Sequence, residues 1–217
     1  MFVVIDWIDW SGKWTQVERV VKELERAWKT VKLLDYPRYG KTSAFMVEKY
    51  LNGEYGNTIW PKLASIFYAV DRYDDSFNFR EDIEKYDYVI SNRYVSASMI
   101  HQAWKIDDIE EKENYINWLE DLEYNIFGIP RPDKTIFLNV SPEMSQRLVL
   151  KKQERDYLKD GKKMDIHEED KDHLMNAHKT AMLVCDMQEN WIKIDCEIAW
   201  EMRPLEDITS EIIGIIK

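Results

Sequence analysis

Cysteine is scarce in this chain, and long apolar runs are missing. The two cysteines, Cys185 and Cys196, are too few for a disulfide framework and do not form a metal-type pair. We therefore expect buried thiols in a reducing compartment. No stretch of about 18 apolar residues occurs, which argues against a transmembrane helix. The first residues, MFVVIDW, lack the basic region of a signal peptide, so we expect a cytoplasmic protein.

Positive charge is also in short supply. The chain has 30 Lys and Arg against 41 Asp and Glu, which gives a net charge of −11. This balance argues against general binding to nucleic acid or to a membrane surface, because both are polyanionic. A phosphate-binding protein with this composition has to gather its basic groups around one site.

Glycine is the third scarcity. Seven glycines occur in 217 residues, whereas ordinary usage of about 7% would give roughly 15. Tryptophan, by contrast, occurs nine times, which is high for this length. The glycine deficit and the tryptophan surplus are similar in size.

The pattern of apolar residues alternates between strand-like and helix-like segments. Short β-branched or apolar runs predict strands at 2–6, 31–36, 86–91, 134–140 and 191–196. Apolar residues at helical spacing predict helices at 13–29, 43–52, 60–73, 79–86, 93–127, 142–160, 166–184 and 205–216. This alternation predicts an α/β fold with a parallel sheet between two helical layers, and we expect residues 1–217 to form one domain.

The first predicted strand and helix enclose a sequence that resembles a phosphate loop. Ser11, Gly12 and Lys13 follow the strand and open the helix. In such loops backbone N–H groups at the helix start face the phosphates. Lys13 is expected to reach the β- and γ-phosphates of ATP, and Thr15 to ligate Mg²⁺. The predicted ATP-binding set is Trp7, Trp10, Ser11, Gly12, Lys13, Trp14 and Thr15.

Three tryptophans stand where this loop requires glycine. Trp7, Trp10 and Trp14 occupy positions at which the backbone turns sharply or approaches phosphate closely. Four more tryptophans fall at expected turns or helix ends: Trp28, Trp60, Trp104 and Trp200. Exchanging these seven would leave fourteen glycines and two tryptophans, Trp118 and Trp191. We predict that the organism reads the UGA codon as glycine at the seven positions.

The alternative is that the tryptophans are real. An indole at position 10 or 14 would then fill the space that the nucleotide needs. The protein would be a catalytically blocked relative of P-loop kinases. Inspection of the seven codons separates the two readings, because the first requires UGA at each of them.

Several separated segments resemble the bacterial thymidylate kinase family over essentially the whole chain. They are VIDWIDWSGKWTQ, DYPRYGKT, LNGEYG, LASIFYAVDRY, SNRYVSASMIHQ and GIPRPDKTIFLNVSPE. The resemblance implies a P-loop NTPase fold, three layers α/β/α with a five-stranded parallel sheet and a helical lid. It also implies transfer of the γ-phosphoryl group of ATP to dTMP, with Mg²⁺, in a homodimer. A kinase of another nucleoside monophosphate is the remaining alternative.

The resemblance also assigns roles to individual residues. Asp9 would contact the 3′-hydroxyl of dTMP and help to place Mg²⁺, and Arg93 would bind phosphate. Tyr68 would stack on thymine, and Arg72 would hydrogen-bond the base carbonyl. The other implied dTMP-binding residues are Tyr36, Arg38 and Tyr39 at the phosphate, and Ser98, His101 and Gln102 near the sugar and base.

Three positions depart from the family pattern. Asn92 replaces the aspartate that commonly precedes the arginine of NRYV, which removes one charge near the metal. Ser98 replaces an asparagine that often contacts the base, and Tyr68 replaces a phenylalanine. We expect Mg²⁺ to be held through water at Asn92, and Tyr68 still to stack.

A basic run suggests the lid. Residues 147–165 carry seven Lys or Arg, in a protein that is otherwise acidic. We expect this segment to close over ATP, with Arg155 as the best candidate for contact with the transition state. His173 follows on an acidic segment, which we expect to be a solvated helix rather than a metal site.

Overall fold

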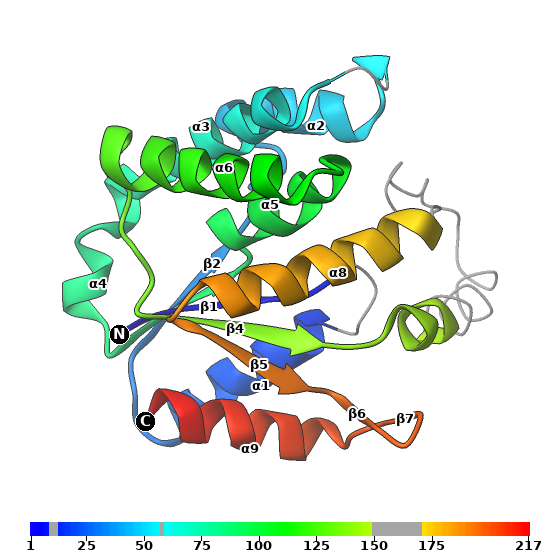
Figure 1. Cartoon of the computed structure of the whole chain (residues 1–217). Coiled ribbons are helices and arrows are strands. Elements are labelled where there is room, and N and C mark those ends of the chain that lie inside the picture. The colour runs from blue at the N-terminus through cyan, green and yellow to red at the C-terminus, as the bar shows by residue number, and fades with distance from the viewer. Residues whose placement is uncertain (9–12, 57–58, 149–170) are drawn as a thin grey trace, which may run out of the picture.

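The computed structural model describes residues 1–8, 13–56, 59–148 and 171–217. A central sheet lies between two layers of helices (Figure 1). The sheet has five strands in the order β2-β3-β1-β4-β5, and every neighbouring pair is parallel. The strands are β1 (Phe2–Asp6), β2 (Val31–Asp35), β3 (Tyr88–Asn92), β4 (Lys134–Asn139) and β5 (Trp191–Asp195). The predicted parallel α/β/α architecture is confirmed.

Strand β1 contributes side chains to two hydrophobic cores, one on each face of the sheet. All five of its residues are buried, because side chains alternate between the two faces of a strand and each face here carries helices. Phe2 and Val4 lie in the core beneath α5 (Val95–His101) and α8 (Lys171–Met187). Val3 and Ile5 lie in the core beneath α1 (Lys13–Arg26) and α9 (Leu205–Ile216). This double burial explains why β1 reads as a continuous apolar run.

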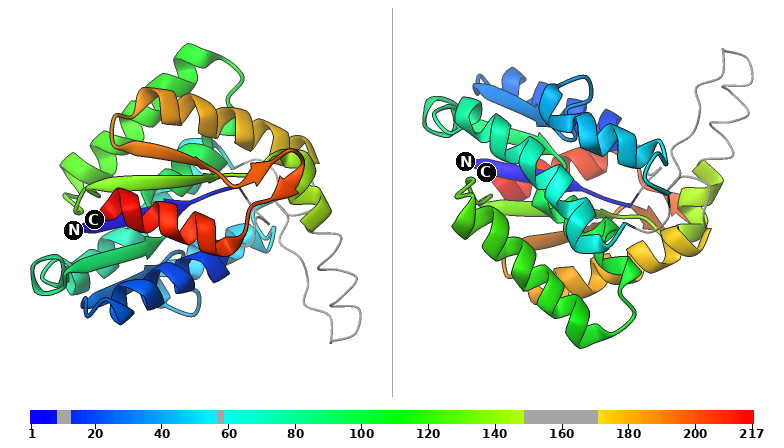
Figure 2. Two further views of the ribbon diagram at one scale, coloured as in Figure 1. Left: turned by 90° about the horizontal axis from the view of Figure 1, so that it is seen from below. Right: turned by 90° about the horizontal axis from the view of Figure 1, so that it is seen from above.

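The helices divide between the two faces of the sheet. Figure 2 shows α1 and α9 on one face, with both chain termini at the same end of the sheet. Helices α5 and α8 pack together on the other face. The helices are α1 (Lys13–Arg26), α2 (Phe45–Leu51), α3 (Pro61–Phe79), α4 (Asp82–Lys85), α5 (Val95–His101), α6 (Ile109–Glu120), α8 (Lys171–Met187) and α9 (Leu205–Ile216), with 3₁₀ turns η1 (Thr42–Ala44) and η3 (Ala103–Lys105). Residues 142–148 are also helical.

The backbone at the end of α1 tests the prediction of glycine at position 28. Trp28 has φ of 60° and a side chain that is 94% exposed. Its N–H donates to the carbonyl of Glu25, and the N–H of Lys29 donates to that of Leu24. These two bonds form a Schellman motif, whose left-handed residue is usually glycine. The backbone at position 28 therefore has the conformation that the sequence analysis assigns to a glycine.

A hairpin near the C-terminus tests another. Strands β6 (Glu197–Ile198) and β7 (Glu201–Met202) are antiparallel and joined by two residues, Ala199 and Trp200. Their φ values are 51° and 65°, as a type I′ turn requires, and such turns favour glycine. The sequence did not predict this hairpin, but it did predict glycine at position 200.

The remaining tryptophans give a mixed result. Trp60 has φ of −66° and is exposed, so its backbone makes no demand for glycine. Trp104 lies in η3 rather than in an open turn, and its partly buried ring packs against the core. Trp118 and Trp191 pack in or against the same core, as predicted for genuine tryptophans. The codon assignment itself stays a prediction.

The predicted long helix over residues 93–127 is divided into four pieces. Helices α5 and α6 are separated by η3, and α6 continues into η4 (Asp121–Ile126), a π-helical turn. The break follows from a capped start of α6, where the side chain of Asp108 accepts a bond from the N–H of Glu111 at 2.9 Å. Among the described residues, none of the helices has the length and apolar character needed to cross a membrane.

Candidate functional site

The carboxyl ends of β1, β2 and β3 meet at one edge of the sheet. In register, Asn92 pairs with Ile5 on one side and with Asp35 on the other. The Nδ2 group of Asn92 donates to the Asp35 carboxylate. Ligands of open parallel sheets bind outside such carboxyl ends, where the order of the strands reverses. The central strand β1 marks that reversal here.

Asp6 ties the end of β1 to α5. The residue is fully buried, and its carboxylate accepts hydrogen bonds from a backbone donor and from a side-chain donor. One comes from the N–H of Trp7 at 2.8 Å and the other from the hydroxyl of Ser96 at 2.5 Å. Asp6 therefore fixes the start of the phosphate loop against the helix that follows Arg93.

Helix α1 begins at Lys13, as the phosphate-loop prediction requires. Its first turn contains no acidic residue, so the positive end of the helix dipole is not neutralised locally. Thr15, the predicted Mg²⁺ ligand, is exposed in this turn. A helix start of this kind suits phosphate oxygens, because its N–H groups have no partner within the helix.

The indole rings at positions 7 and 14 differ in their surroundings. Trp7 is completely buried and belongs to the core between the sheet and helices α1 and α9. Trp14 is 41% exposed, and its Nε1 donates to the Glu18 carboxylate at 2.8 Å. The fold thus accommodates an indole at position 7 without expelling it to solvent.

Arg93 lies directly beside the start of the loop. Its backbone N–H donates to the carbonyl of Ile5 at 3.1 Å, one residue before the end of β1. Arg93 also has φ of 62°, in the left-handed region. Non-glycine residues in that region carry strain that tertiary contacts must hold, and such residues are frequent at functional sites. Its predicted role at phosphate stays a prediction.

Arg38 is held by acidic side chains of α3. Its guanidinium contacts Asp71 at 3.0 Å, Asp74 at 2.5 Å and Asp75 at 2.7 Å. The backbone N–H of Arg38 also donates to Asp71, and Ser43 accepts from its Nη2. Asp71 is only 1% exposed, which makes it the firmest of the three anchors. A phosphate at Arg38 would have to share the guanidinium with these carboxylates.

Arg72 is buried within a network that joins three elements, α3, α5 and η4. Its side chain from α3 donates to both carboxylate oxygens of Glu123 on η4, at 2.6 Å each. It donates further to the carbonyl of Tyr94 at 3.2 Å and to the hydroxyl of Ser98 on α5 at 3.1 Å. The nearby carboxylate of Glu123 raises the pKa of Arg72 against the opposing effect of burial. The structure therefore brings together two predicted base-binding residues, Arg72 and Ser98.

Tyr68 and Gln102 are brought together by Tyr50. The rings of Tyr50 and Tyr68 lie edge to face with centroids 6.3 Å apart. The Tyr50 hydroxyl donates to the side-chain oxygen of Gln102 at 3.3 Å, and Lys105 donates to the same oxygen at 2.9 Å. Burial lowers the pKa of Lys105 to about 8. Sequence reasoning had not singled out Tyr50 or Lys105.

The other predicted acceptor residues vary in exposure. Tyr36 is buried, and its hydroxyl donates to Asp75 at 2.8 Å. Tyr39 is 62% exposed. His101 is buried and stacks on His173 of α8 with ring centroids 5.7 Å apart. The expectation of a solvated helix around His173 is therefore wrong, because that side chain closes the packing between α5 and α8.

Several predicted residues lie outside the described residues. They are Asp9, Trp10, Ser11 and Gly12 of the phosphate loop, Arg155, and nearly all of the predicted lid at 147–165. For Lys13 only the backbone is described. Their roles at ATP, Mg²⁺ and the transition state stay predictions.

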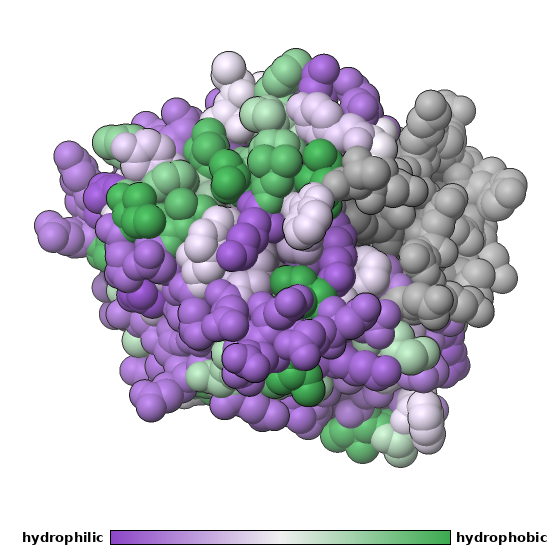
Figure 3. All heavy atoms as spheres, turned by 45° about the horizontal axis from the view of Figure 1, so that its top comes forward, coloured by the Kyte–Doolittle hydropathy of each residue, from purple (hydrophilic) through white to green (hydrophobic). Residues whose placement is uncertain are grey.

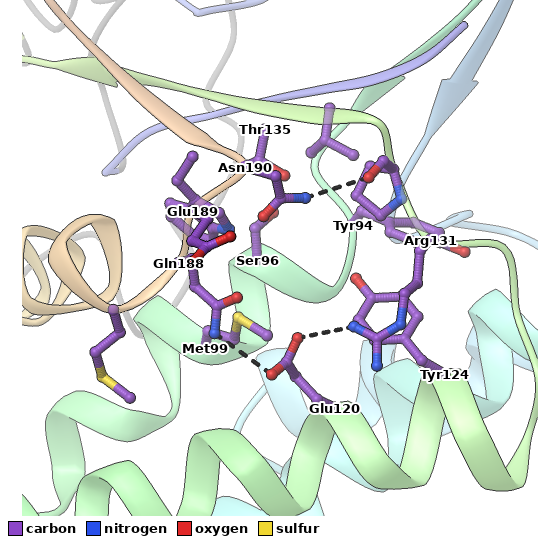
Figure 4. Close-up of a pocket in the computed structure, with 14 residues that line it drawn as sticks. Tyr94, Ser96, Met99, Glu120, Tyr124, Arg131, Thr135, Gln188, Glu189 and Asn190 are labelled. Carbon is purple, nitrogen blue, oxygen red and sulfur yellow. Dashed lines mark hydrogen bonds and ion pairs between the residues drawn. The ribbon is translucent and has the colours of Figure 1, made fainter.

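A cavity of about 460 Å³ lies away from this edge. It is lined by Thr135 and Trp191 at the amino ends of β4 and β5, and by none of the predicted nucleotide ligands. Figure 4 shows Glu120 between Gln188 and Arg131, with contacts of 3.4 Å and 3.1 Å. Because none of the predicted nucleotide ligands lines this cavity, we do not assign the nucleotide site to it.

Two further candidate residues, Asp6 and Glu123, were not predicted from the sequence. Asp6 reads as the last residue of a strand, and Glu123 as one acidic residue among several on an expected helix. A charged residue inside an otherwise apolar strand was a usable signal for Asp6. Glu123 had no such signal, because its partner lies 51 residues away in the sequence.

The fold and the site define a phosphotransferase of the P-loop class, in which a central parallel strand leads into a helix at the phosphates. The family profile described as "Thymidylate kinase" matches residues 5–198, and the chain belongs to this family. A thymidylate kinase of Mycobacterium tuberculosis is 28% identical over 172 residues, which is 78% of each chain. A probable thymidylate kinase of Methanocaldococcus jannaschii is 26% identical over 100% of this chain and 96% of its own.

A solved structure supports the fold. The thymidylate kinase of Candida albicans superposes with a TM-score of 0.76 at 18% identity. The match covers 99% of this chain and 90% of that one. The arrangement of strands and helices described above is thus the arrangement of this family.

Proposed function

We propose that this chain transfers the γ-phosphoryl group of ATP to dTMP, giving dTDP and ADP. The observation that carries the proposal is the junction of β1 with the phosphate loop, where the backbone of Arg93 bonds to Ile5. This bond supports the proposal because it brings the backbone of Arg93 to the end of the strand that precedes the predicted phosphate loop. A kinase that joins two phosphorylated substrates needs such a cation between them.

The reaction needs no histidine or carboxylate base. An oxygen of the dTMP phosphate attacks the γ-phosphorus of ATP, forming one P–O bond as the bond to the β-phosphate oxygen breaks. Positioning and charge neutralisation then supply most of the acceleration. We assign neutralisation to Lys13, Arg93 and Arg155, and acceptor placement to Asp9, with Arg38 and Tyr39 at the acceptor phosphate.

The donor set at the carboxyl edge fits a magnesium ion. The Oδ1 atom of Asn92 is buried and has no hydrogen-bond partner among the described residues. Oxygen ligands and retained waters are what Mg²⁺ prefers. We propose Thr15 and Asp9 as ligands, with Asn92 reached through water. When bound, the ion would neutralise charge on the β- and γ-phosphates.

The base would rest between the aromatic and the polar groups of the acceptor side. Tyr68 supplies a ring for stacking, while Arg72 and Ser98 supply hydrogen bonds that stacking alone does not. Tyr36, His101 and Gln102 complete the proposed surroundings of the nucleotide.

We also propose that two copies associate through α3. Leu63, Val70, Tyr73 and Phe77 are exposed apolar residues at helical spacing on this helix, at 44%, 43%, 37% and 65% exposure. Figure 3 shows hydrophobic side chains gathered over the helices at the top of the molecule. Sedimentation should find a dimer, and Phe77→Glu should shift it toward monomer.

The cytoplasm is the proposed compartment. Cys185 and Cys196 are both free thiols. Burial raises the pKa of each to about 12, so neither is a reactive thiolate at neutral pH. Such thiols suit a reducing environment.

A nucleotide panel tests the proposed reaction. The chain with glycine at positions 7, 10 and 14, given ATP and Mg²⁺, should phosphorylate dTMP faster than dUMP, dCMP, dAMP or dGMP. Preference for another acceptor would reject dTMP as the substrate. If the seven codons are UGA and the folded glycine-containing protein phosphorylates none of these nucleotides, the kinase assignment is rejected altogether.

A further inference from the structure

Glu123 is a buried carboxylate for which the reaction gives no direct use. Its side chain is 0% exposed, and that of its partner Arg72 is 2% exposed. The two donor atoms of Arg72 that meet it, Nε and Nη2, lie 2.6 Å from separate carboxylate oxygens. This is a bidentate pair, which fixes the plane of the guanidinium as well as its position.

Four of the five N–H groups of the Arg72 guanidinium donate hydrogen bonds within the described residues. A guanidinium has five N–H donors and no acceptor. Glu123 takes one from Nε and one from Nη2, Ser98 takes the other from Nη2, and the carbonyl of Tyr94 takes one from Nη1. The second N–H of Nη1 therefore has no acceptor among the described residues. Its direction is set by the other four bonds.

The π-helical turn explains how Glu123 comes to face inward. The N–H of Phe127 bonds to the carbonyl of Leu122 at 2.8 Å, five residues back, and this wider ring shifts the side chains of η4 around the axis. Glu120 and Tyr124 line the cavity on one side of the turn, whereas Glu123 faces Arg72. π-turns of this kind often mark functional sites.

We propose that Glu123 is a positioning residue that fixes Arg72 to read the 4-carbonyl of the pyrimidine and so sets the preference for thymine over cytosine. The proposal rests on the proposed function. Arg72 can only donate hydrogen bonds. It can therefore bond to the 4-carbonyl oxygen of thymine, whereas the 4-amino group of cytosine, itself a donor, would be left unpaired. A fixed donor discriminates more strongly than one that can turn away.

Equilibrium binding tests this role without depending on the phosphate loop. Titration calorimetry would give Kd values for dTMP, dCMP and ATP with the unaltered chain and with Glu123→Gln. We expect the ratio of the dCMP and dTMP Kd values to fall at least about tenfold in the variant, the worth of one charge-assisted hydrogen bond. The Kd for ATP should change less than about twofold, because ATP binds at the other end of the site.

Glu120→Gln is the matched control. It makes the same chemical change three positions earlier and breaks the ion pair with Arg131, which does not contact Arg72. Its Kd ratio should equal that of the unaltered chain. Glu123→Asp serves if Glu123→Gln does not fold, since it keeps the charge but draws the carboxylate back, and it should lower the ratio in the same direction.

The outcomes separate two failures. If the unaltered chain does not prefer dTMP over dCMP, the proposed substrate is wrong. If it does, and the Glu123 variants keep that preference or weaken dTMP, dCMP and ATP equally, Glu123 has only a structural role and the inference is overturned.

Discussion

The donor and acceptor sides of the site are built in different ways. On the donor side, α1 follows β1 in the chain, and the groups that we propose for phosphate are largely backbone N–H groups at a helix start. On the acceptor side, the guanidinium groups of Arg38 and Arg72 are held by carboxylates of α3 and η4 and by a hydroxyl of α5. The donor side depends on the conformation of the backbone, whereas the acceptor side depends on contacts between side chains.

This difference predicts which substitutions each side tolerates. A backbone cradle fails when a side chain occupies the space or bars a conformation, so the donor side is sensitive to residues other than glycine. A side-chain network fails when one partner of a buried charge is removed, so the acceptor side is sensitive to loss of charge. The following experiments test that division.

The largest effect is expected at the loop. Replacing Trp7, Trp10 and Trp14 by glycine should raise kcat/KM for ATP and dTMP by at least about 10²-fold, the cost of misplacing reacting groups by about 1 Å. Steady-state kinetics of the triple variant and the printed chain would measure it. Equal activity of the two proteins would show that the donor side does not depend on glycine.

The next effect is expected at Asp71 on the acceptor side. Asp71→Asn removes the buried charge that holds Arg38, and KM for dTMP should rise about tenfold, because a hydrogen bond to a charged group is worth about 1.5–3 kcal/mol. Asp74→Asn is the control. Asp74 contacts the same guanidinium, but its side chain is 61% exposed, and KM should change less than about twofold. Similar changes in both variants would contradict the division into buried and exposed anchors.

A pH-dependent effect is expected at Lys105. Burial lowers its pKa to about 8 from the ordinary 10.5. Between these values the unfolded chain binds more protons than the folded one, so the free energy of unfolding rises with pH. Lys105→Met should remove this contribution, whose slope is at most about 1.4 kcal/mol per pH unit. Urea unfolding at pH 8, 9 and 10 would measure it, with exposed Lys29→Met as control. A constant difference between the Lys105 variant and the unaltered chain would refute the shift.

The smallest effects are expected far from the site. Trp28→Gly and Trp200→Gly should each raise the free energy of unfolding by about 1 kcal/mol, because they relieve a side chain at positive φ. Trp60→Gly is the control, since φ there is −66°, and it should give no gain. Thermal unfolding of the three variants would measure the change in stability. Equal changes in all three would show that positive φ is not the reason why glycine is favoured at positions 28 and 200.

Much of the fold could be predicted from local sequence. The five strands of the sheet fall within two residues of their predicted bounds, because buried strands carry runs of β-branched and aromatic side chains. The start of α1 at Lys13 followed from the phosphate-loop pattern. The hairpin at 197–202 was missed although a turn was expected at position 200, because strands of two residues each are too short to show an alternating pattern.

The candidate site could be predicted only in part. The resemblance supplied Arg72 and Ser98, and the structure joins them through one hydrogen bond. It could not supply Glu123, because nothing in the segment DLEYNI distinguishes that carboxylate from its neighbours. The π-helical turn that contains Glu123 continues α6, which packs against α5 and α3, so the surroundings of Glu123 come from residues distant in the sequence.

The sequence by itself determined the five strands of the parallel sheet, the order in which strands and helices alternate, and the start of α1 at Lys13. These depend on interactions within a few residues, which short patterns record. Only the tertiary structure decided that Asp6 meets Ser96 across 90 residues and that Arg72 meets Glu123 across 51. Packing of the helices on the sheet removes the charges of Asp6, Arg72 and Glu123 from water. A buried charge is stable only when it is hydrogen-bonded or paired, so these contacts depend on the tertiary structure.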